Sequence, residues 1–280
     1  MNGVDRIAAV FAATRAEGRA ALMPYLTLGY PSPEMTIPLV QAVVQAGADI
    51  LELGIPFSDP LADGPTIQRA TYRALQQGMT VARSLEMAAA LRREGVDVPF
   101  VLMSYYNPIL AYGEEAFCRA CQEVGVDGLI VPDLPPEEGE TLEAHSRARG
   151  LALVYLLAPT STPERIRQAA ERTEGFLYLV SVTGTTGARE HLPPDLADFI
   201  RRVRAVTEKP LAVGFGISRP EQARAVGALA DGVIVGSALI QAVEAQGVSG
   251  AAAFVADLRR ALNAGNHPGR GWSKSVIGHF

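Results

Sequence analysis

The sequence predicts an α/β protein of the (β/α)8 class, a TIM barrel with an extra N-terminal helix, and three features of its 280 residues indicate this fold. Eight short apolar runs alternate with segments of helical period, as expected for strands that are each followed by a helix. Several runs are continuously apolar, which is typical of parallel strands buried on both faces. Glycine follows several helical segments, as it commonly does at helix ends. An open doubly wound sheet is the alternative, but it rarely contains eight such regular units.

The predicted elements follow in chain order. An amphipathic segment, MNGVDRIAAVFAATRAEGR, precedes the first run and predicts a helix that covers the bottom of the barrel. The predicted strands lie near 20–28, 49–53, 99–103, 128–131, 152–156, 176–180, 211–214 and 232–235. Glycines expected at helix ends are Gly47, Gly95, Gly125 and Gly150. Two S-x-x-E motifs, at 161–164 and 218–221, predict helix starts with a capping box.

The domain organisation follows from the absence of a linker or a composition break. Residues 1–264 are predicted to form one domain, with the barrel core at about 20–246. Residues 265–280 are glycine-rich and lack a period, so they are expected to form a mobile tail.

Composition and charge exclude several classes of protein. With 30 acidic and 25 basic residues the net charge is −5, which argues against a nucleic-acid surface because such a surface is basic. No apolar run approaches the ~18 residues of a membrane helix, and the first residues do not resemble a signal peptide. We therefore expect a cytoplasmic protein. The two cysteines, Cys118 and Cys121, are expected to pack inside one amphipathic helix rather than act in redox chemistry.

Carboxylates mark the first candidate site. Glu52 lies within an apolar strand, where a buried carboxylate is costly unless it has a partner or a chemical task. Asp63 follows in a loop that contains three prolines, which can hold it over the barrel mouth at little entropic cost. Asp59 is a further candidate in this loop, although it could simply form a turn.

Glycine segments after the last two strands mark a second candidate site, for an anion. Gly214, Phe215 and Gly216 follow the seventh run, and Gly236 and Ser237 follow the eighth. Backbone N–H groups at helix starts bind phosphate, and these two loops are the usual phosphate position in this fold. Ordinary tight turns are the alternative interpretation.

A glycine- and threonine-rich loop at 181–190, after the sixth run, is predicted to be a lid that closes over a phosphorylated substrate. Thr186 and Gly187 are its candidate residues, and Gly184 could add an N–H group to the phosphate site. An ordinary flexible loop remains the alternative.

The small number and the positions of the lysines and histidines restrict the types of reaction that this chain is expected to catalyse. Of the two lysines, Lys209 lies at the entrance of a strand and Lys274 lies in the tail, so neither suits a Schiff base. The four histidines lack the spacing of metal ligands, and no metal site is expected. What remains is acid–base chemistry by carboxylates on a phosphorylated small molecule.

Several motifs resemble the α-subunit family of tryptophan synthase over roughly residues 20–245. They are PYLTLGYP, LELGIPFSDPLADGPTIQ, YYNP, VPDLPPEE, YLVSVTGTTGAR and GFGISRPEQ, in the family's order. The resemblance implies a barrel that cleaves indole-3-glycerol phosphate to indole and glyceraldehyde 3-phosphate. It also implies that this chain carries no cofactor and that a β subunit, which carries pyridoxal phosphate, receives the indole, in an expected α2β2 assembly.

The resemblance also implies roles for individual residues. Glu52 matches the family's general acid–base, Asp63 its second catalytic carboxylate and Tyr178 a tyrosine near that pair. The implied phosphate-binding residues are Gly184, Gly214, Gly216, Gly236 and Ser237, and the implied indole pocket contains Tyr25, Ile67 and Phe215. Tyr25 brings a hydroxyl that needs a partner. The implied β-subunit contacts are Pro56, Asp59, Tyr106, Asn107 and Pro108.

Three other interpretations of the protein's function remain open. A stand-alone lyase on the same fold would release free indole without a partner. A sugar-phosphate isomerase or epimerase would use Glu52 as an enolising base. A catalytically silent subunit would only activate its partner, and it would tolerate loss of Glu52 or Asp63.

Overall fold

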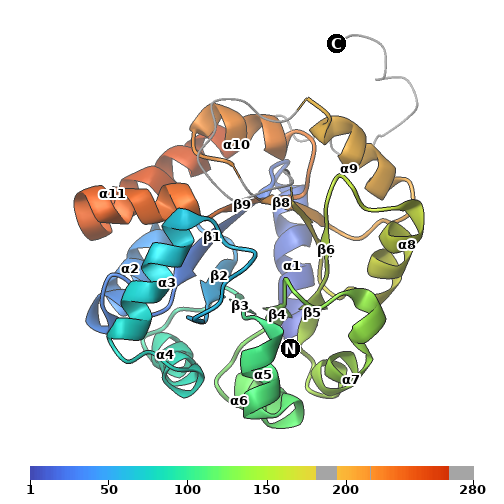
Figure 1. Cartoon of the computed structure of the whole chain (residues 1–280). Helices are drawn as coiled ribbons and strands as arrows, with labels where there is room; N and C mark the ends of the chain where they lie inside the picture. Colours follow the sequence, from blue (N-terminus) through green and yellow to red (C-terminus); the bar gives the residue numbers. More distant parts are fainter. Residues whose placement is uncertain (181–193, 215, 265–280) are drawn as a thin grey trace.

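The computed structural model describes residues 1–180, 194–214 and 216–264, and it confirms the predicted parallel barrel (Figure 1). The strands are β1 (Ala21–Thr27), β2 (Leu51–Gly54), β3 (Phe100–Met103), β4 (Gly128–Ile130), β5 (Ala152–Val154), β6 (Leu156–Leu157), β7 (Leu177–Val180), β8 (Leu211–Gly214) and β9 (Gly232–Val235). They pair in the order β5-β4-β3-β2-β1-β9-β8-β7-β6, and each pairing is parallel. All eight predicted apolar runs therefore become strands.

The structure divides the barrel wall into nine segments rather than eight because one predicted run is interrupted. Tyr155 alone separates β5, which pairs with β4, from β6, which pairs with β7. The backbone N–H of Tyr155 donates to the Thr173 hydroxyl, at 3.0 Å, instead of to a strand carbonyl. The two segments are thus one wall strand with a local break, and together they close the ring.

Helices cover the outside of the barrel and its bottom (Figure 1). They are α1 (Gly3–Ala16), α2 (Pro33–Gln45), α3 (Pro65–Gln76), α4 (Val81–Arg93), α5 (Tyr106–Tyr112), α6 (Glu114–Glu123), α7 (Glu140–Ala148), α8 (Pro163–Arg172), α9 (Leu196–Arg204), α10 (Pro220–Gly227) and α11 (Ser237–Asn263), with a short 3-10 helix at Pro136–Glu138. By length and composition alone α11 could cross a membrane. It is broken at Gly247, however, and it packs against β1, α2, α3 and α10 as part of the barrel's cover.

Two apolar cores follow from the alternation of side chains along the strands. Outward-facing residues such as Leu53 and Val213 pack against the helices, and inward-facing residues such as Met23 and Val101 fill the barrel. Ile7 and Phe11 of α1 belong to the inner core. The predicted N-terminal helix therefore closes the bottom of the barrel, as expected.

Helix ends agree with the sequence prediction better than helix starts do. Gly47, Gly95, Gly125 and Gly150 all have positive φ, as expected for glycine just beyond a helix. Both cysteines are buried on α6, as predicted.

Both predicted capping boxes are wrong in detail. At α8 the cap is Thr162, whose hydroxyl accepts from the N–H of Arg165, while the Ser161 hydroxyl accepts from the N–H of Ala158. At α10 the Gln222 side chain accepts from the N–H groups of residues 218 and 219, so Glu221 has no part in the cap. In each case proline at the first helical position moves the cap one residue along.

Three aspartates, of which two are buried and the first is half-buried, lie at the bottom of the barrel, just before β2, β4 and β9. Each accepts a backbone N–H and pairs with two arginines: Asp49 with Arg19 and Arg259, Asp127 with Arg6 and Arg92, and Asp231 with Arg15 and Arg204. One arginine of each group comes from α1 or from the turn that follows it. We call these sets the three aspartate–arginine groups. They fasten the N-terminal helix to strands on different sides of the barrel.

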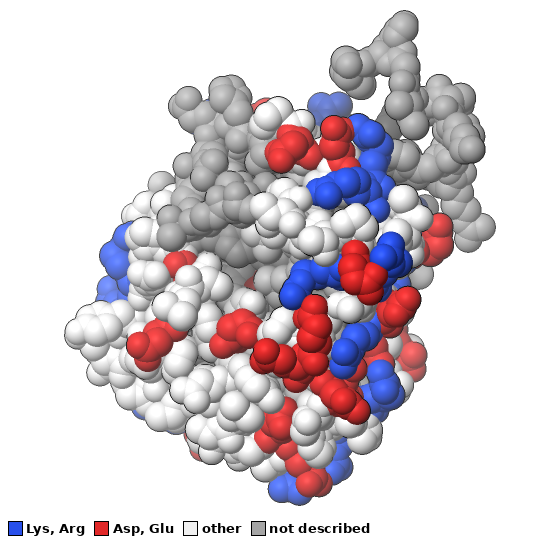
Figure 2. Space-filling model, turned by 45° about the vertical axis from the view of Figure 1, so that its right-hand side comes forward, with Lys and Arg blue, Asp and Glu red and all other residues white. Residues whose placement is uncertain are grey.

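The described surface carries charges of both signs. Figure 2 shows acidic and basic side chains interspersed over the face that carries α7, α8 and α9, where pairs such as Arg167–Glu164 and Arg201–Asp198 form. This face therefore presents no continuous basic surface of the kind that binds nucleic acid.

Candidate active site

Glu52 occupies an interior position near the carboxyl end of the barrel. Its neighbours Leu51 and Leu53 point outward, and its partners in register on β1 and β3 are the inward-facing Tyr25 and Val101. Its residue surface is only 2% exposed, and its Oε2 atom has no hydrogen-bond partner among the described residues. Burial, reinforced by the charge of Asp63, raises the pKa of Glu52 to about 8. At neutral pH this side chain therefore carries a proton that it can donate.

Asp63 lies at the end of the loop between β2 and α3, next to Gly64, the residue that caps α3. Its backbone N–H donates to Pro60, at 3.1 Å, and its carbonyl accepts from the Gln68 side chain, at 2.8 Å. The residue as a whole is 4% exposed. Burial raises the pKa of Asp63 to about 6, although a hydrogen bond from Tyr105 opposes the shift. The loop therefore brings Asp63 close to Glu52, as its prolines predicted, and at neutral pH it is largely ionised.

Tyr105 was not identified by the sequence analysis, yet it contacts the loop that carries Asp63. Its hydroxyl oxygen accepts the backbone N–H of Ala62 at 2.9 Å, and Tyr105 and Asp63 line the same small pocket. Its ring packs against Phe57, with 5.4 Å between the ring centroids. The signal available in the sequence was its position, two residues beyond the end of β3, where barrel enzymes place functional side chains.

Two tyrosines lie beside the carboxylates, each over a glycine. A Cβ atom at Gly54 would overlap the hydroxyl of Tyr25, and a Cβ atom at Gly214 would overlap the hydroxyl of Tyr178. Tyr25 meets its expected need for a partner through Thr27, at 3.2 Å between the hydroxyl oxygens. Burial and the charges of Glu52 and Asp63 raise the pKa of Tyr178, so its hydroxyl stays protonated. Gly214, predicted as a phosphate ligand, thus also makes room for Tyr178.

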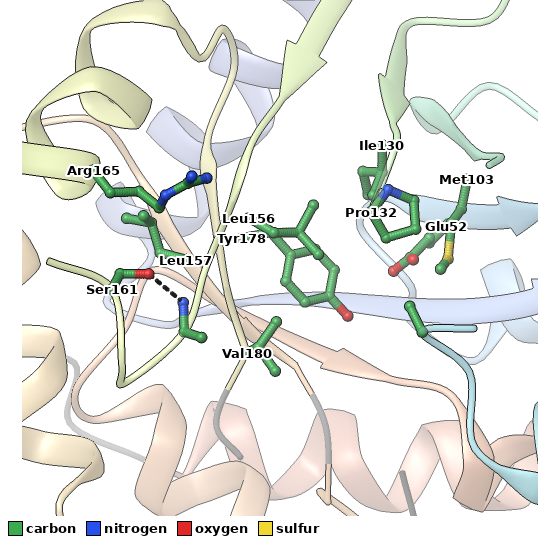
Figure 3. A pocket seen from close by; sticks show the side chains of 12 residues that line it. Glu52, Met103, Ile130, Pro132, Leu156, Leu157, Ser161, Arg165, Tyr178 and Val180 are labelled. Carbon is green, nitrogen blue, oxygen red and sulfur yellow. Dashed lines mark hydrogen bonds between the residues drawn. The ribbon is translucent and has the colours of Figure 1, made fainter. Parts of the chain in front are cut away.

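A pocket of about 360 Å³ opens beside Glu52 and Tyr178 (Figure 3). Figure 3 shows the ring of Tyr178 extending toward the side on which Glu52 and Met103 lie, while Arg165 lies on the opposite side. Most of the lining is apolar, from Met103, Ile130, Pro132, Leu156, Leu157 and Val180. The sequence analysis missed these apolar residues, although the inward positions of Met103 and Ile130 at strand ends could have indicated those two. Such a cavity suits a flat aromatic ring.

The predicted phosphate site is only partly within the described residues. Gly214 ends β8, and Gly236 and Ser237 lie at the start of α11, after the neighbouring β9. None of the described side chains caps α11, so among these residues nothing occupies its first N–H groups, which suit an anion. Gly216 has a φ of 82°. Gly184, Thr186, Gly187 and Phe215 lie outside the described residues, and their predicted roles stay predictions.

The remaining predicted pocket residues lie next to this glycine segment. Tyr25 and Ile67 both come within 3.5 Å of the Cβ position of Gly236, which places them between the carboxylates and the predicted anion site. A ligand with an aromatic ring at one end and a phosphate at the other would therefore pass over these two side chains.

The predicted partner residues differ in exposure. Asp59 and Asn107 are exposed, Tyr106 and Pro108 are half-buried, and Pro56 is buried and can only shape its loop. Tyr106 is also tied into the fold, because its hydroxyl donates to Glu114 at 3.0 Å. Within residues 1–180, 194–214 and 216–264, the structure contains no group of three residues suited to a metal ion.

Known proteins resemble this chain in both sequence and fold. The family described as tryptophan synthase alpha chain matches residues 11–264. The alpha chain of Chloroflexus aggregans is 52% identical over 259 residues, which cover 91% of this chain and 97% of that protein. A Mycobacterium tuberculosis tryptophan synthase structure aligns with a TM-score of 0.87 at 41% identity, covering 93% of this chain and 99% of the other. The alpha subunit structure from Legionella pneumophila aligns with a TM-score of 0.85 at 39% identity, covering 94% and 99%.

Proposed function

The chain belongs to the tryptophan synthase alpha chain family, and from this we propose how its own residues carry out the family's reaction. It is a lyase subunit of tryptophan biosynthesis that cleaves indole-3-glycerol phosphate to indole and glyceraldehyde 3-phosphate. The observation that carries our assignment is the pair of buried carboxylates, Glu52 and Asp63, at the carboxyl end of the barrel. Neither of them forms an ion pair with a described arginine or lysine. Their charges are therefore available to the substrate rather than used in the fold.

Glu52 moves the protons of the cleavage. Its protonated carboxyl gives a proton to C3 of the indole, which makes the ring cationic, and the resulting carboxylate takes the proton of the adjacent side-chain hydroxyl. The carbon–carbon bond then breaks, its electron pair returns to the ring, and the hydroxyl carbon becomes the aldehyde. Glu52 ends as it began, and the raised pKa of about 8 suits this exchange because it keeps the acid form at neutral pH.

Asp63 stabilises the charge that appears on the ring. Its ionised carboxylate accepts the hydrogen bond of the indole N–H, and this bond strengthens as the ring becomes cationic. Because the indole ring itself accepts electrons, the reaction needs no lysine, metal or cofactor in this chain. Tyr178, fixed over Gly214, holds the ring edge against the carboxylates.

The phosphate of the substrate binds at the ends of β8 and β9. Gly214, Gly216 and Gly236 allow close approach of the backbone, and the N–H groups at the start of α11 face the anion. The phosphate contacts made beyond the reacting atoms position the substrate over Glu52.

The partner is the tryptophan synthase beta subunit, which carries the pyridoxal phosphate and consumes the indole. We place its docking surface at the barrel mouth, where Leu61 and Tyr72 are 89% and 64% exposed and flank a groove of about 350 Å³. Leu110 and Tyr112 of α5 add exposed apolar surface at the same end. Exposed apolar and aromatic side chains of this kind suit an interface core. We expect an α2β2 assembly in the cytoplasm.

The test is indole release from indole-3-glycerol phosphate, by the chain alone and with a beta subunit added. We expect slow cleavage alone, strong stimulation by the partner, and a loss of about 10²–10⁴-fold in Glu52→Gln and in Asp63→Asn. Glu164→Gln, an exposed glutamate on α8, is the matched control and should retain the wild-type rate. Fast cleavage without the partner would instead support a stand-alone lyase, and full activity in Asp63→Asn would overturn the role of that residue.

A further inference from the structure

The pocket beside Glu52 has two ends of different chemistry. Glu52 lies on one side of the Tyr178 ring, and Arg165 lies on the opposite side (Figure 3). Among the described residues, Arg165 is the one cationic side chain in the lining of this pocket. The walls between the two ends are mostly apolar. A pocket built in this way suits a flat ring that carries different polar groups on its two edges.

Arg165 has hydrogen-bond donors that the fold does not use. Its guanidinium pairs with Glu137, on the 3-10 helix, with 3.1 Å between Nη2 and Oε1, and it forms no hydrogen bond with the described residues. The two side chains are 40% and 46% exposed, so the pair resembles a surface ion pair, which contributes little to stability. Because an arginine has five N–H donors, a second carboxylate can bind Arg165 at little cost to the fold.

Ser161 adds a neutral donor at the same end of the pocket. Its hydroxyl oxygen accepts the N–H of Ala158 at 3.0 Å, and its own N–H donates to the carbonyl of Ala158 at 2.8 Å. These two bonds hold the serine in a tight turn, and they leave its hydroxyl hydrogen without an acceptor among the described residues. Ser161 and Arg165 both line the pocket, so its outer end offers two donors to a ligand.

The proposed reaction decides which edge of the indole ring faces these donors. Protonation at C3 and the hydrogen bond from the ring N–H place the five-membered ring at Glu52 and Asp63. The benzo edge is the opposite edge of the fused ring, and it therefore points away from Glu52, toward the side on which Arg165 lies (Figure 3). An unsubstituted indole has no polar group on this edge, and it leaves Ser161 and Arg165 without a ligand partner.

We propose that Ser161 and Arg165 form a subsite for a carboxylate on the benzo edge of an indole ring. This inference rests on the proposed function, which sets the orientation of the ring, and it extends the ligand class to indoles with a negatively charged benzo ring. The guanidinium of Arg165 binds the carboxylate, and the Ser161 hydroxyl donates to one of its oxygens. Glu137 competes with the ligand for the same guanidinium.

The test is the binding of indole-6-carboxylate to the full chain, measured by titration calorimetry beside its neutral counterpart, indole-6-carboxamide. We expect the carboxylate to bind about 3- to 10-fold more tightly, because a charge-assisted hydrogen bond at a half-exposed arginine is stronger than a surface ion pair. Arg165→Gln should remove this preference and leave the affinities for the amide and for indole unchanged. Added indole should displace the carboxylate, since both occupy the same pocket.

Arg167→Gln is the matched control. Arg167 lies on the same helix, α8, where it is 53% exposed and pairs with Glu164, and it does not line the pocket. Its loss should leave the preference for the carboxylate intact.

Glu137→Gln tests the competition for Arg165. Without this carboxylate, the ligand should bind about 2- to 3-fold more tightly, because its competitor is gone. If Arg165 and Glu137 only tie two loops together, the affinity should not rise.

Two results would overturn the inference. One is equal affinity of the wild-type chain for the carboxylate and the amide; the other is an equal effect of Arg165→Gln and Arg167→Gln on the preference. Failure of the proposed function would be a different result, since the chain would then release no indole from indole-3-glycerol phosphate. The calorimetry needs no turnover, so it would still show whether Arg165 binds an aromatic carboxylate.

Discussion

Buried carboxylates lie at both ends of this barrel, and the two ends differ in whether these carboxylates have positively charged partners. At the bottom, the buried Asp127 and Asp231 and the half-buried Asp49 each have two arginine partners and a backbone N–H. At the mouth, Glu52 and Asp63 have no described cationic partner, and one oxygen of Glu52 has no hydrogen bond among the described residues. The same residue types are thus buried twice, once with their charges compensated and once without.

The pKa directions follow from this contrast. Burial alone would raise the pKa of Asp231, but Arg204, the N–H of Leu211 and Arg15 together lower it. At Asp127 burial outweighs the partners, and the pKa is raised. At the mouth nothing of comparable strength opposes burial, and the pKa of Glu52 reaches about 8. Compensated carboxylates therefore serve the fold, while uncompensated ones mark the site where charge is used in a reaction.

The largest effect on stability is expected from Asp231→Ala, which leaves Arg15, Arg204 and a buried N–H without their partner. We expect a loss of about 3–5 kcal/mol in the free energy of unfolding, measured by denaturant titration. Asp198→Ala removes an exposed partner of Arg201 on α9 and should cost well under about 1 kcal/mol. Equal losses in the two variants would show that the bottom group contributes no more than a surface ion pair.

A gain in stability is expected at the other end, from Glu52→Gln. The pKa of Glu52 is raised from 4.5 to about 8, so its contribution to stability is fully present below pH 4.5 and is lost as the pH rises through 8. The variant does not titrate, and at pH 9 it should be more stable than the wild type by an amount of order 2 kcal/mol. Thermal unfolding at pH 5 and pH 9 measures this. A gap that stays constant between the two pH values would contradict the raised pKa.

The smallest effect is expected from Arg15→Gln, which removes one of the two arginines of Asp231. Its side chain is 44% exposed, and Arg204 remains, so the loss should be about 0.5–1 kcal/mol and should shrink at high salt. Denaturant titration at low and high salt tests both points. A loss as large as that of Asp231→Ala would mean that the two arginines do not share the charge.

How much the sequence predicted depends on how local each feature is. Some features were predictable because they depend only on residues that are neighbours in the sequence. These are the strands and the bottom helix, which follow from hydrophobic periodicity, and the helix ends, which follow from glycine. The sequence singled out Glu52 and Asp63 because a carboxylate in an apolar strand and a proline-rich loop are both unusual, and the structure buries both residues, while their catalytic roles stay predictions. The break at Tyr155 was not, because it depends on a hydrogen bond to Thr173, from a different part of the chain.

Features made by distant residues escaped the sequence analysis. Arg15 and Asp231 are 216 positions apart, and each alone is an ordinary charged residue. Tyr105 likewise accepts the N–H of Ala62, 43 positions earlier in numbering, which only the closed barrel brings near. The predicted boundary at residue 264 stays a prediction, since residues 265–280 lie outside the described part of the chain.

The fastening of α1 to the bottom of the barrel has a consequence for the order in which the chain is made. α1 leaves the ribosome before the barrel strands, yet the partner of its Arg15 is Asp231, which is added 216 residues later. At about 5–20 residues per second, the helix waits about 10–40 s for that carboxylate. Throughout this time Ile7 and Phe11 lack the barrel interior that buries them in the finished protein. Helix α1 is therefore among the last elements to reach its final contacts. During synthesis its exposed apolar face must be kept from associating with other nascent chains.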